Sequence, residues 1–175
     1  MKKLLIVLML ATTASAGFLV EPYLGYRVGD LESTSGGTIA YDTSGHSIGA
    51  RLGGTFTMFM AGIDYSMGSL SADQTKGGST DVDLDTTQLG IFAGIELPIL
   101  LRAWATYYLS ANFENSSNNN EWKGDGIGLG VGFTGLPFVS LNLEYKKLSY
   151  DEAPTGKAKY DGSEIQFGVS LPLNL

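Results

Sequence analysis

Apolar and polar residues alternate along most of this chain, and the pattern is clearest at its C-terminal end. From Ser163 to Leu175, every second residue from Ile165 onward is apolar, and most of the residues between them are polar or glycine. An alternation with a period of two is typical of a β-strand that has one apolar and one polar face. The edge of such a strand needs a partner, and pairing with the first strand of the same chain would close a barrel.

The same test, applied to the rest of the sequence, predicts eight strands in all. The predicted strands are 18–29, 47–56, 58–68, 86–97, 102–113, 125–134, 138–147 and 163–175. Each is close to the roughly 9–11 residues that cross a bilayer at a tilt. The connections at 57, 98–101 and 135–137 are short, whereas those at 30–45, 69–85, 114–124 and 149–160 are long and polar. This organisation predicts an all-β, eight-stranded antiparallel up-and-down transmembrane β-barrel, with both termini in the periplasm.

The first 16 residues have a different character and resemble a secretory signal peptide. Lys2 and Lys3 precede an apolar run at 4–10, and Ala14-Ser15-Ala16 has the small residues of a cleavage site. The apolar run is too short to span a bilayer. We therefore expect a signal peptide at 1–16, cleavage before Gly17, and one barrel domain at 17–175.

Composition agrees with a strand-rich exported protein and limits its partners. The chain has 24 Gly, 9 Tyr and 8 Phe, a mixture that suits strands and turns, and it has no Cys for disulfides. Its mean hydropathy is only +0.07. The formal net charge is −7, and loss of Lys2 and Lys3 leaves nine basic against 18 acidic residues, which gives −9. This acidity argues against nucleic-acid binding.

The alternation alone leaves open whether the apolar face points inward, as in a secreted lipocalin-like barrel, or outward into lipid. Four glycines on the polar face of 125–134 favour a polar interior, because glycine makes room in a narrow lumen but only weakens a solvated strand. The apolar face carries almost no charge, and its aromatic residues lie near the strand ends, as in membrane barrels. These are Tyr26, Tyr65, Phe113 and Tyr145 toward the loops, and Phe18 and Phe56 toward the turns.

The polar face carries acids and bases together, as a buried network would require. We predict a structural lumen charge network made of Glu21, Arg27, Arg51, Asp64, Glu96, Arg102, Glu144, Lys146 and Glu164. At least one arginine–carboxylate pair should bridge the lumen, because an isolated charge there would be costly. Arginine suits this role better than lysine, since its planar fork can hold more than one carboxylate. A lumen filled in this way argues against an open solute channel.

Four features carry a family resemblance, and the first is the predicted signal peptide at 1–16. V-E-P-Y-L-G-Y at 20–26, G-x-R-L-G-G at 49–54 and the alternating C-terminal strand resemble the small outer-membrane β-barrels of Gram-negative bacteria, such as the OmpA transmembrane domain, OmpX and OmpW. The resemblance implies a monomer in the bacterial outer membrane with its long loops outside the cell. It also implies three partners, namely outer-membrane lipid, periplasmic chaperones and the barrel-insertion machinery.

Some barrels of this size modify lipid A, so a catalytic site has to be considered. The single histidine, His46, is next to Ser47, but adjacent residues on a strand point to opposite faces and cannot form a side-by-side pair. No G-x-S-x-G or H-E-x-x-H motif is present. We therefore expect no catalytic site and no cofactor.

A cluster of Asp81, Asp83 and Asp85 could supply oxygen ligands to Ca²⁺. It lacks the glycine and glutamate spacing of a calcium loop, so a solvated acidic loop is the favoured interpretation and we expect no metal site. Trp122, beside the polar segment 115–120, is interpreted as a membrane-interface anchor rather than a binding aromatic.

The sequence thus predicts an integral outer-membrane barrel with a structural or surface-interaction role, in which the loops are presented to the surroundings. A narrow pore for small solutes is the alternative, and a lipid A-modifying enzyme is a more remote one.

Overall fold

The computed structural model describes residues 16–34, 39–76, 78, 81–116, 120–154 and 157–175. Nearly all of these residues lie in strands: β1 (Ala16–Ser33), β2 (Ala40–Phe56), β3 (Phe59–Lys76), β4 (Asp81–Leu97), β5 (Leu101–Asn115), β6 (Glu121–Phe133), β7 (Ser140–Glu152), β8 (Tyr160–Ser170) and β9 (Leu173–Asn174). No helix in these ranges is long and apolar enough to cross a membrane. The predicted signal peptide lies outside the described residues, except for Ala16, which begins β1.

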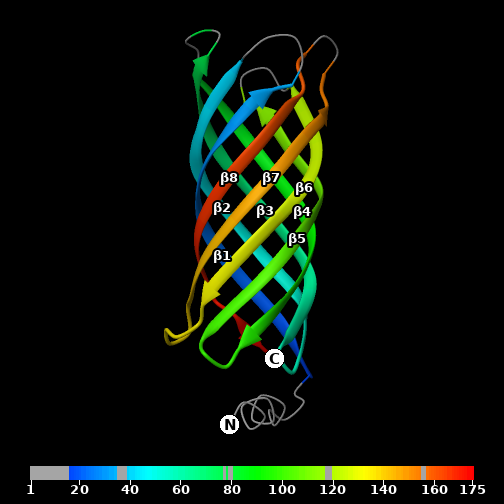
Figure 1. Cartoon of the computed structure of the whole chain (residues 1–175). Helices are drawn as coiled ribbons and strands as arrows, with labels where there is room; N and C mark the ends of the chain where they lie inside the picture. The colour runs from blue at the N-terminus through cyan, green and yellow to red at the C-terminus, as the bar shows by residue number, and fades with distance from the viewer. Residues whose placement is uncertain (1–15, 35–38, 77, 79–80, 117–119, 155–156) are drawn as a thin grey trace, which may run out of the picture.

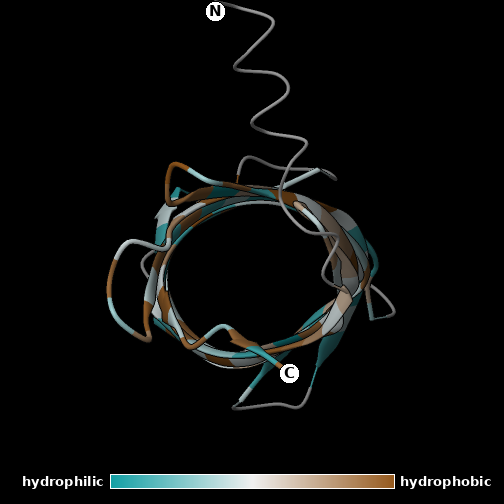
Figure 2. Cartoon of the chain, turned by 90° about the horizontal axis from the view of Figure 1, so that it is seen from below, coloured by the Kyte–Doolittle hydropathy of each residue, from teal (hydrophilic) through white to brown (hydrophobic). Residues whose placement is uncertain are grey.

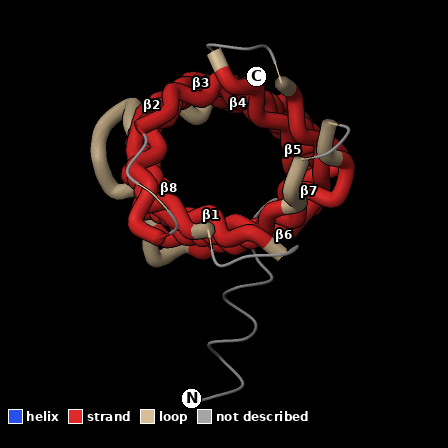
Figure 3. The backbone as a smooth tube through the Cα atoms, turned by 90° about the horizontal axis from the view of Figure 1, so that it is seen from above, coloured by secondary structure: helices blue, strands red, loops and turns tan. Residues whose placement is uncertain are grey.

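The strands form one closed antiparallel sheet (Figure 1, Figure 3). Each strand from β1 to β8 pairs with the next, and β8 pairs back with β1, where Tyr26 faces Phe167. The predicted eight-stranded barrel is therefore confirmed. The predicted final strand is interrupted at Leu171 and Pro172, because proline has no backbone N–H to donate. The chain then returns to the sheet as β9, where Leu173 faces Val20.

The two ends of the barrel differ, and we call them the turn end and the loop end. At the turn end, the short connections 57–58, 98–100 and 134–139 each contain one non-glycine residue with a positive φ: Thr57 (58°), Leu100 (63°) and Phe138 (67°). The other four connections, between β1 and β2, β3 and β4, β5 and β6, and β7 and β8, define the loop end. Seen from the turn end, the strands form a ring with the C-terminus at its rim (Figure 2).

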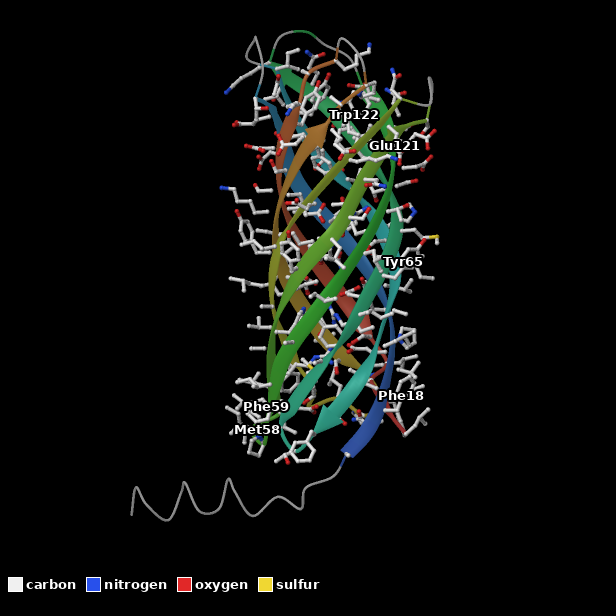
Figure 4. The ribbon with its side chains drawn as sticks, turned by 90° about the vertical axis from the view of Figure 1, so that its right-hand side faces the viewer. Phe18, Met58, Phe59, Tyr65, Glu121 and Trp122 are labelled. Atoms are coloured by element: carbon white, nitrogen blue, oxygen red, sulfur yellow. The ribbon has the colours of Figure 1, made fainter. Side chains whose placement is uncertain are left out.

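An apolar belt surrounds the barrel from the turn end to beyond its middle. It consists of the outward-facing residues of 18–28, 48–56, 59–67, 89–95, 101–109, 127–133, 141–145 and 165–173. Large side chains in it are widely exposed, as with Leu24 (63%) and Leu129 (60%). Phe18 and Phe59 lie on the outside near the turn end, and Tyr65 lies farther up (Figure 4). The belt side chains point outward, and the charged residues within these ranges are buried inside the barrel, so the predicted apolar-out orientation is correct there.

All eight long strands, β1 to β8, continue toward the loop end beyond their predicted limits. For example, β3 runs to Lys76 and β4 begins at Asp81, so most of the predicted loop 69–85 is strand. Above the belt the alternation is inverted, with polar residues outside and apolar residues inside. The outward residues include Asp30, Asp42, Ser69, Ser71, Asp73, Asp83, Asp85, Ser149 and Asp161, and the inward ones include Leu31, Leu70, Ala72, Leu84, Leu148 and Tyr150. The loop end is therefore built as a barrel in water is, with an apolar core.

A β-bulge in β5 changes which residues of that strand point inward. Leu89 faces Ser110 whereas Gly90 faces Tyr108, so Leu109 is an extra residue in the ladder. As a result Ala111 and Phe113, which the simple alternation predicted to face outward, are buried with 0% and 4% exposure. The prediction that Phe113 belongs to the outer aromatic belt was wrong.

Candidate functional site

The middle of the lumen holds an ionic network centred on Arg51. From β2, Arg51 contacts Asp64 through Nε at 2.9 Å and, across the lumen, Glu144 of β7 through Nη2 at 3.0 Å. Its Nη1 lies 3.6 Å from Glu21, and its guanidinium stacks 4.3 Å from the centre of the Trp104 ring. One arginine therefore serves three carboxylates, which is the geometry that its planar fork allows.

Tyrosines complete this lower part of the network, and a second arginine closes it toward the turn end. The Tyr23 hydroxyl donates to Asp64 at 2.7 Å, and the Tyr108 hydroxyl donates to Glu144 at 2.8 Å. Arg102 of β5 holds Glu21 of β1 with both terminal nitrogens, and its Nη1 distance is 2.8 Å. Buried carboxylates are costly unless they are paired and hydrogen-bonded, and each carboxylate here has such partners.

A second group of charges lies nearer the loop end and is centred on Glu164. Lys146 Nζ lies 3.2 Å from its Oε1, and Arg27 Nη1 lies 3.6 Å from its Oε2. Gln88 donates to Glu164 at 3.1 Å and accepts from Lys146 at 2.8 Å, while Arg27 also donates to Thr86. The structure therefore places eight of the nine predicted charges in the lumen: Glu21, Arg27, Arg51, Asp64, Arg102, Glu144, Lys146 and Glu164. We call these eight residues the lumen network.

Glu96 is the exception. It faces Arg102 in the β4–β5 ladder, but it lies at the turn end and is exposed to solvent. No ion pair among the described residues involves it, because Arg102 turns inward to Glu21 instead. The sequence analysis placed Glu96 in the lumen because it occupies an inward-facing position in the alternation of its strand. That alternation does not show that Glu96 lies at the end of the strand, where the barrel is open to solvent.

Glycines make room for the lumen network, as the sequence predicted. A Cβ atom built on Gly128 would lie 2.7 Å from Glu144 and 3.1 Å from the Tyr108 ring. A Cβ atom on Gly130 would overlap the indole of Trp104. Trp104 packs with Leu19, Met60 and Phe92 into an apolar layer below the charges. The narrow lumen is thus filled by side chains from the turn end to the network.

Above the network, an aromatic cup opens at the loop end. Four rings line it (Tyr41, Phe113, Trp122 and Tyr160), together with Leu31, Ala72, Val82, Leu84 and Asn115, around a half-open cavity of about 60 Å³. Phe113 and Trp122 stack with ring centres 4.9 Å apart, and Tyr160 meets both edge-on at 6.1 Å. The Trp122 indole also donates a hydrogen bond to the Ala158 carbonyl at 2.9 Å, which fixes the orientation of its ring.

The cup was missed by the sequence analysis, and Trp122 was interpreted wrongly. Trp122 is only 7% exposed and points into the barrel, so it is not a membrane-interface anchor. Figure 4 shows it at the loop end beside Glu121, which is exposed. The available signal was the inversion of the alternation, since inward positions change from polar to apolar at Leu31, Leu70 and Leu148. The bulge in β5 concealed the contribution of Phe113.

Comparisons with known proteins agree with this architecture. The family model described as "Outer membrane protein beta-barrel domain" matches residues 4–171, which is nearly the whole chain. The chain belongs to this outer membrane protein β-barrel family. A search of curated proteins finds no match.

Solved structures of two other small barrels share the fold. Ail, the attachment invasion locus protein of Yersinia pestis, in complex with the heparin analogue sucrose octasulfate, is 10% identical with a TM-score of 0.62, and the alignment covers 90% of this chain and 99% of Ail. Neisserial surface protein A is 18% identical with a TM-score of 0.56, and the alignment covers 90% of this chain and 98% of that protein. These identities are low, so the likeness concerns the fold.

As a member of the outer membrane protein β-barrel family, the chain is a protein of the bacterial outer membrane, and its apolar belt is the surface that faces lipid. The belt ends where the outward serines and aspartates begin. Several of these are joined by hydrogen bonds across neighbouring strands, such as Ser69 to Asp85 at 2.8 Å and Ser149 to Asp161 at 2.7 Å. The loop end therefore extends beyond the bilayer as a hydrogen-bonded barrel.

The remaining candidate residues of this family member, apart from Ser47, lie on the outer surface of the barrel. His46 is exposed and Ser47 is buried on the opposite face, as the sequence analysis expected. Asp81, Asp83 and Asp85 lie on the outward face of β4 rather than in a loop, and two of them accept hydrogen bonds from serines. No group of three or more potential metal ligands occurs within the described ranges.

Charge is strongly segregated along the barrel. The lumen network contains four acids and four bases and is neutral, and Glu96 is alone at the turn end. All other acidic residues lie at the loop end: Asp30, Glu32, Asp42, Asp73, Asp81, Asp83, Asp85, Glu114, Glu121, Asp125, Asp151, Glu152 and Asp161. The bases there are Lys76, Lys123, Lys147, Lys157 and Lys159. Thirteen acids against five lysines give the loop end a net charge of −8.

Proposed function

We propose that this barrel is a non-catalytic, non-conducting surface protein whose loop end faces the outside of the cell and binds cationic partners. The observation that carries the proposal is the segregation of charge, since the whole excess of negative charge, apart from Glu96, is at the loop end. Such a concentration of one sign attracts partners of the opposite sign and raises their rate of encounter. Folding of the barrel needs neutral pairs in the lumen, but it does not need this outer excess.

The same charge argues against polyanionic ligands. The structure of Ail was solved with sucrose octasulfate, a polysulfated molecule. A loop end with a net charge of −8 would repel such a molecule, so we do not extend that ligand to this chain. The shared barrel supports the presentation of a binding surface, whereas the residues at the loop end determine which partner binds.

The filled lumen supports a binding role over the pore alternative. Arg51, Arg102 and Lys146 are all at least 97% buried and are held by carboxylates. A solute would have to separate these pairs and then pass the layer formed by Trp104 and its neighbours. For insertion into the membrane we still expect periplasmic chaperones and the barrel-insertion machinery to act, and we expect a monomer.

Binding of a short polycation tests the proposal directly. Purified protein in a neutral sugar-based detergent should bind hexalysine and should not bind hexaglutamate or sucrose octasulfate. Affinity for hexalysine should fall steeply as salt is raised, because the Debye length falls from about 10 Å at 0.1 M to about 3 Å at 1 M. Binding of the polyanions in place of hexalysine would overturn the proposal.

Charge variants locate the binding surface. Simultaneous Asp81→Asn, Asp83→Asn and Asp85→Asn substitutions keep side chains that can accept the serine hydrogen bonds but remove three charges, and they should weaken hexalysine binding. Glu96→Gln is the matched control, because it removes an exposed charge at the turn end. Equal loss from both changes would show that binding does not occur at the loop end.

A further inference from the structure

We propose that the aromatic cup is a binding site for a methylated ammonium group carried by a small soluble organic cation. This inference rests on the proposed role of the loop end in binding cations, and it adds a defined site and a chemical class. Two features of the cup combine to support it, namely the four aromatic rings that line the cavity and the carboxylates that surround it.

The cup is lined by the type of side chain that is typical of sites for organic cations. Tyr41, Phe113, Trp122 and Tyr160 contribute four aromatic side chains to one half-open cavity. The negative faces of such rings attract a cation, tryptophan most strongly, and the attraction grows when water is excluded. An inorganic ion would have to lose its hydration shell with few oxygen ligands in return, whereas a methylated ammonium is weakly hydrated. The cup therefore suits an organic cation better than a metal ion.

Carboxylates surround the cup on the outer face of the same strands. Because side chains alternate along a strand, an acidic residue directly neighbours each of the four rings: Asp42 beside Tyr41, Glu114 beside Phe113, Glu121 beside Trp122 and Asp161 beside Tyr160. These acids do not line the cavity. They make the electrostatic potential at the mouth of the cavity negative, but they add no hydrated group to its wall. This combination favours a weakly hydrated organic cation over a neutral or anionic molecule.

The size of the cavity sets a limit on the ligand. About 60 Å³ is more than the roughly 10–15 Å³ of cavity that holds one water molecule, but it is well below the roughly 150 Å³ of a cavity that encloses benzene. A small ammonium head can enter from the open side, while the remainder of the ligand stays outside. Below the cup, Leu70, Leu148 and Tyr150 close the lumen, so the ligand binds without being transported.

The unaltered protein provides the first test, by equilibrium dialysis in a maltoside detergent, which has no ammonium head. Choline should bind, and its neutral isostere 3,3-dimethylbutan-1-ol should bind about tenfold more weakly, since only the cation gains from the ring faces. Added salt should weaken the binding of choline and leave that of the isostere unchanged. Phosphocholine, which has the same head beside a phosphate, should bind more weakly than choline.

Equal or tighter binding of the neutral isostere would overturn the proposal, because the cup would then be a simple apolar cavity. Absence of choline binding would also overturn it, and preference for phosphocholine would contradict the role assigned to the surrounding carboxylates. If hexalysine still binds while choline does not, only this inference fails. If neither binds, the proposed function fails as well.

Variants assign the site within the protein. Phe113→Leu and Trp122→Leu should each reduce choline binding by about tenfold, given the strength of cation–ring contacts in a desolvated site, and should leave hexalysine binding nearly unchanged. Phe133→Leu is the matched control, because it removes an exposed aromatic ring of the apolar belt. Equal loss of choline binding in all three variants would place the site outside the cup.

Discussion

At the scale of single residues, the lumen is organised so that no buried charge is alone. Arg102 and Glu21 form the most direct pair, with two parallel contacts between β5 and β1. The parity of the polar positions predicted both residues, and the sequence also predicted that an arginine would bridge the lumen. It could not show which acid pairs with which base, because that depends on depth along strands that are far apart in sequence.

The first prediction concerns this pair. Arg102→Met should destabilise the barrel by about 3–5 kcal/mol, because it leaves Glu21 buried with a weaker partner. The double change Arg102→Met with Glu21→Gln should be less destabilising than Arg102→Met alone. Urea-induced unfolding in lipid vesicles measures both values. If the double variant is less stable than either single variant, the two side chains do not act as a compensating pair.

The second prediction concerns glycine in the lumen wall. Gly130→Ala should cost about 1–3 kcal/mol of unfolding free energy, since its new methyl group would overlap Trp104 and force the core to shift. Gly54→Ala provides the control. Its Cβ would meet only one atom, the Gly17 carbonyl oxygen at 3.9 Å, so it should be tolerated. Similar losses at both positions would indicate a general effect of glycine on strands rather than crowding in the lumen.

At the scale of the strands, the medium around the barrel determines which face is apolar. In β3, Ile63, Tyr65 and Met67 point outward into lipid, and Ser69 and Ser71 continue the same face into water. The sequence predicted the lipid-facing segment because every second residue there is apolar without interruption. It could not predict the segment above the belt. There the apolar residues face inward and the polar residues face outward, and the resulting polar stretch resembles a loop. The bulge at Leu109 hid one more change of face.

The third prediction uses this boundary. Leu143→Arg, in the belt, should destabilise the folded barrel by about 2–4 kcal/mol, because an arginine in the middle of the bilayer is costly. Ser149→Arg, on the same face of β7 but above the belt, should cost little, because Asp161 is next to it. Unfolding in vesicles compares the two. Equal tolerance of both substitutions would contradict the placement of the belt in lipid.

At the scale of the whole molecule, the barrel has three layers in its lumen and two zones on its outer surface. Apolar layers lie above and below the lumen network, and the apolar belt gives way to an acidic loop end. The sequence indicated a membrane barrel through the alternation of apolar and polar residues, and through the mixture of acids and bases on the polar face beside an almost uncharged apolar face. It did not indicate the cup, whose four rings come from β2, β5, β6 and β8 and meet only after the sheet closes.

The fourth prediction follows from the filled lumen. Purified protein inserted into a planar bilayer should show no steady conductance, because ion pairs and Trp104 occupy the path of any ion. A double Arg102→Ala, Glu21→Ala variant removes one of these obstacles and provides a comparison for leakage. A large, stable open channel in the unaltered protein would favour the pore alternative.

The orientation of the loop end underlies the whole account, and site-specific labelling of living cells tests it most directly. The chain has no cysteine, so single Lys157→Cys and Leu136→Cys variants each provide one reactive thiol, at the loop end and the turn end respectively. A membrane-impermeant maleimide should label Lys157→Cys on intact cells and should label Leu136→Cys only after the outer membrane is opened. Labelling of Leu136→Cys on intact cells, with Lys157→Cys protected, would contradict the account.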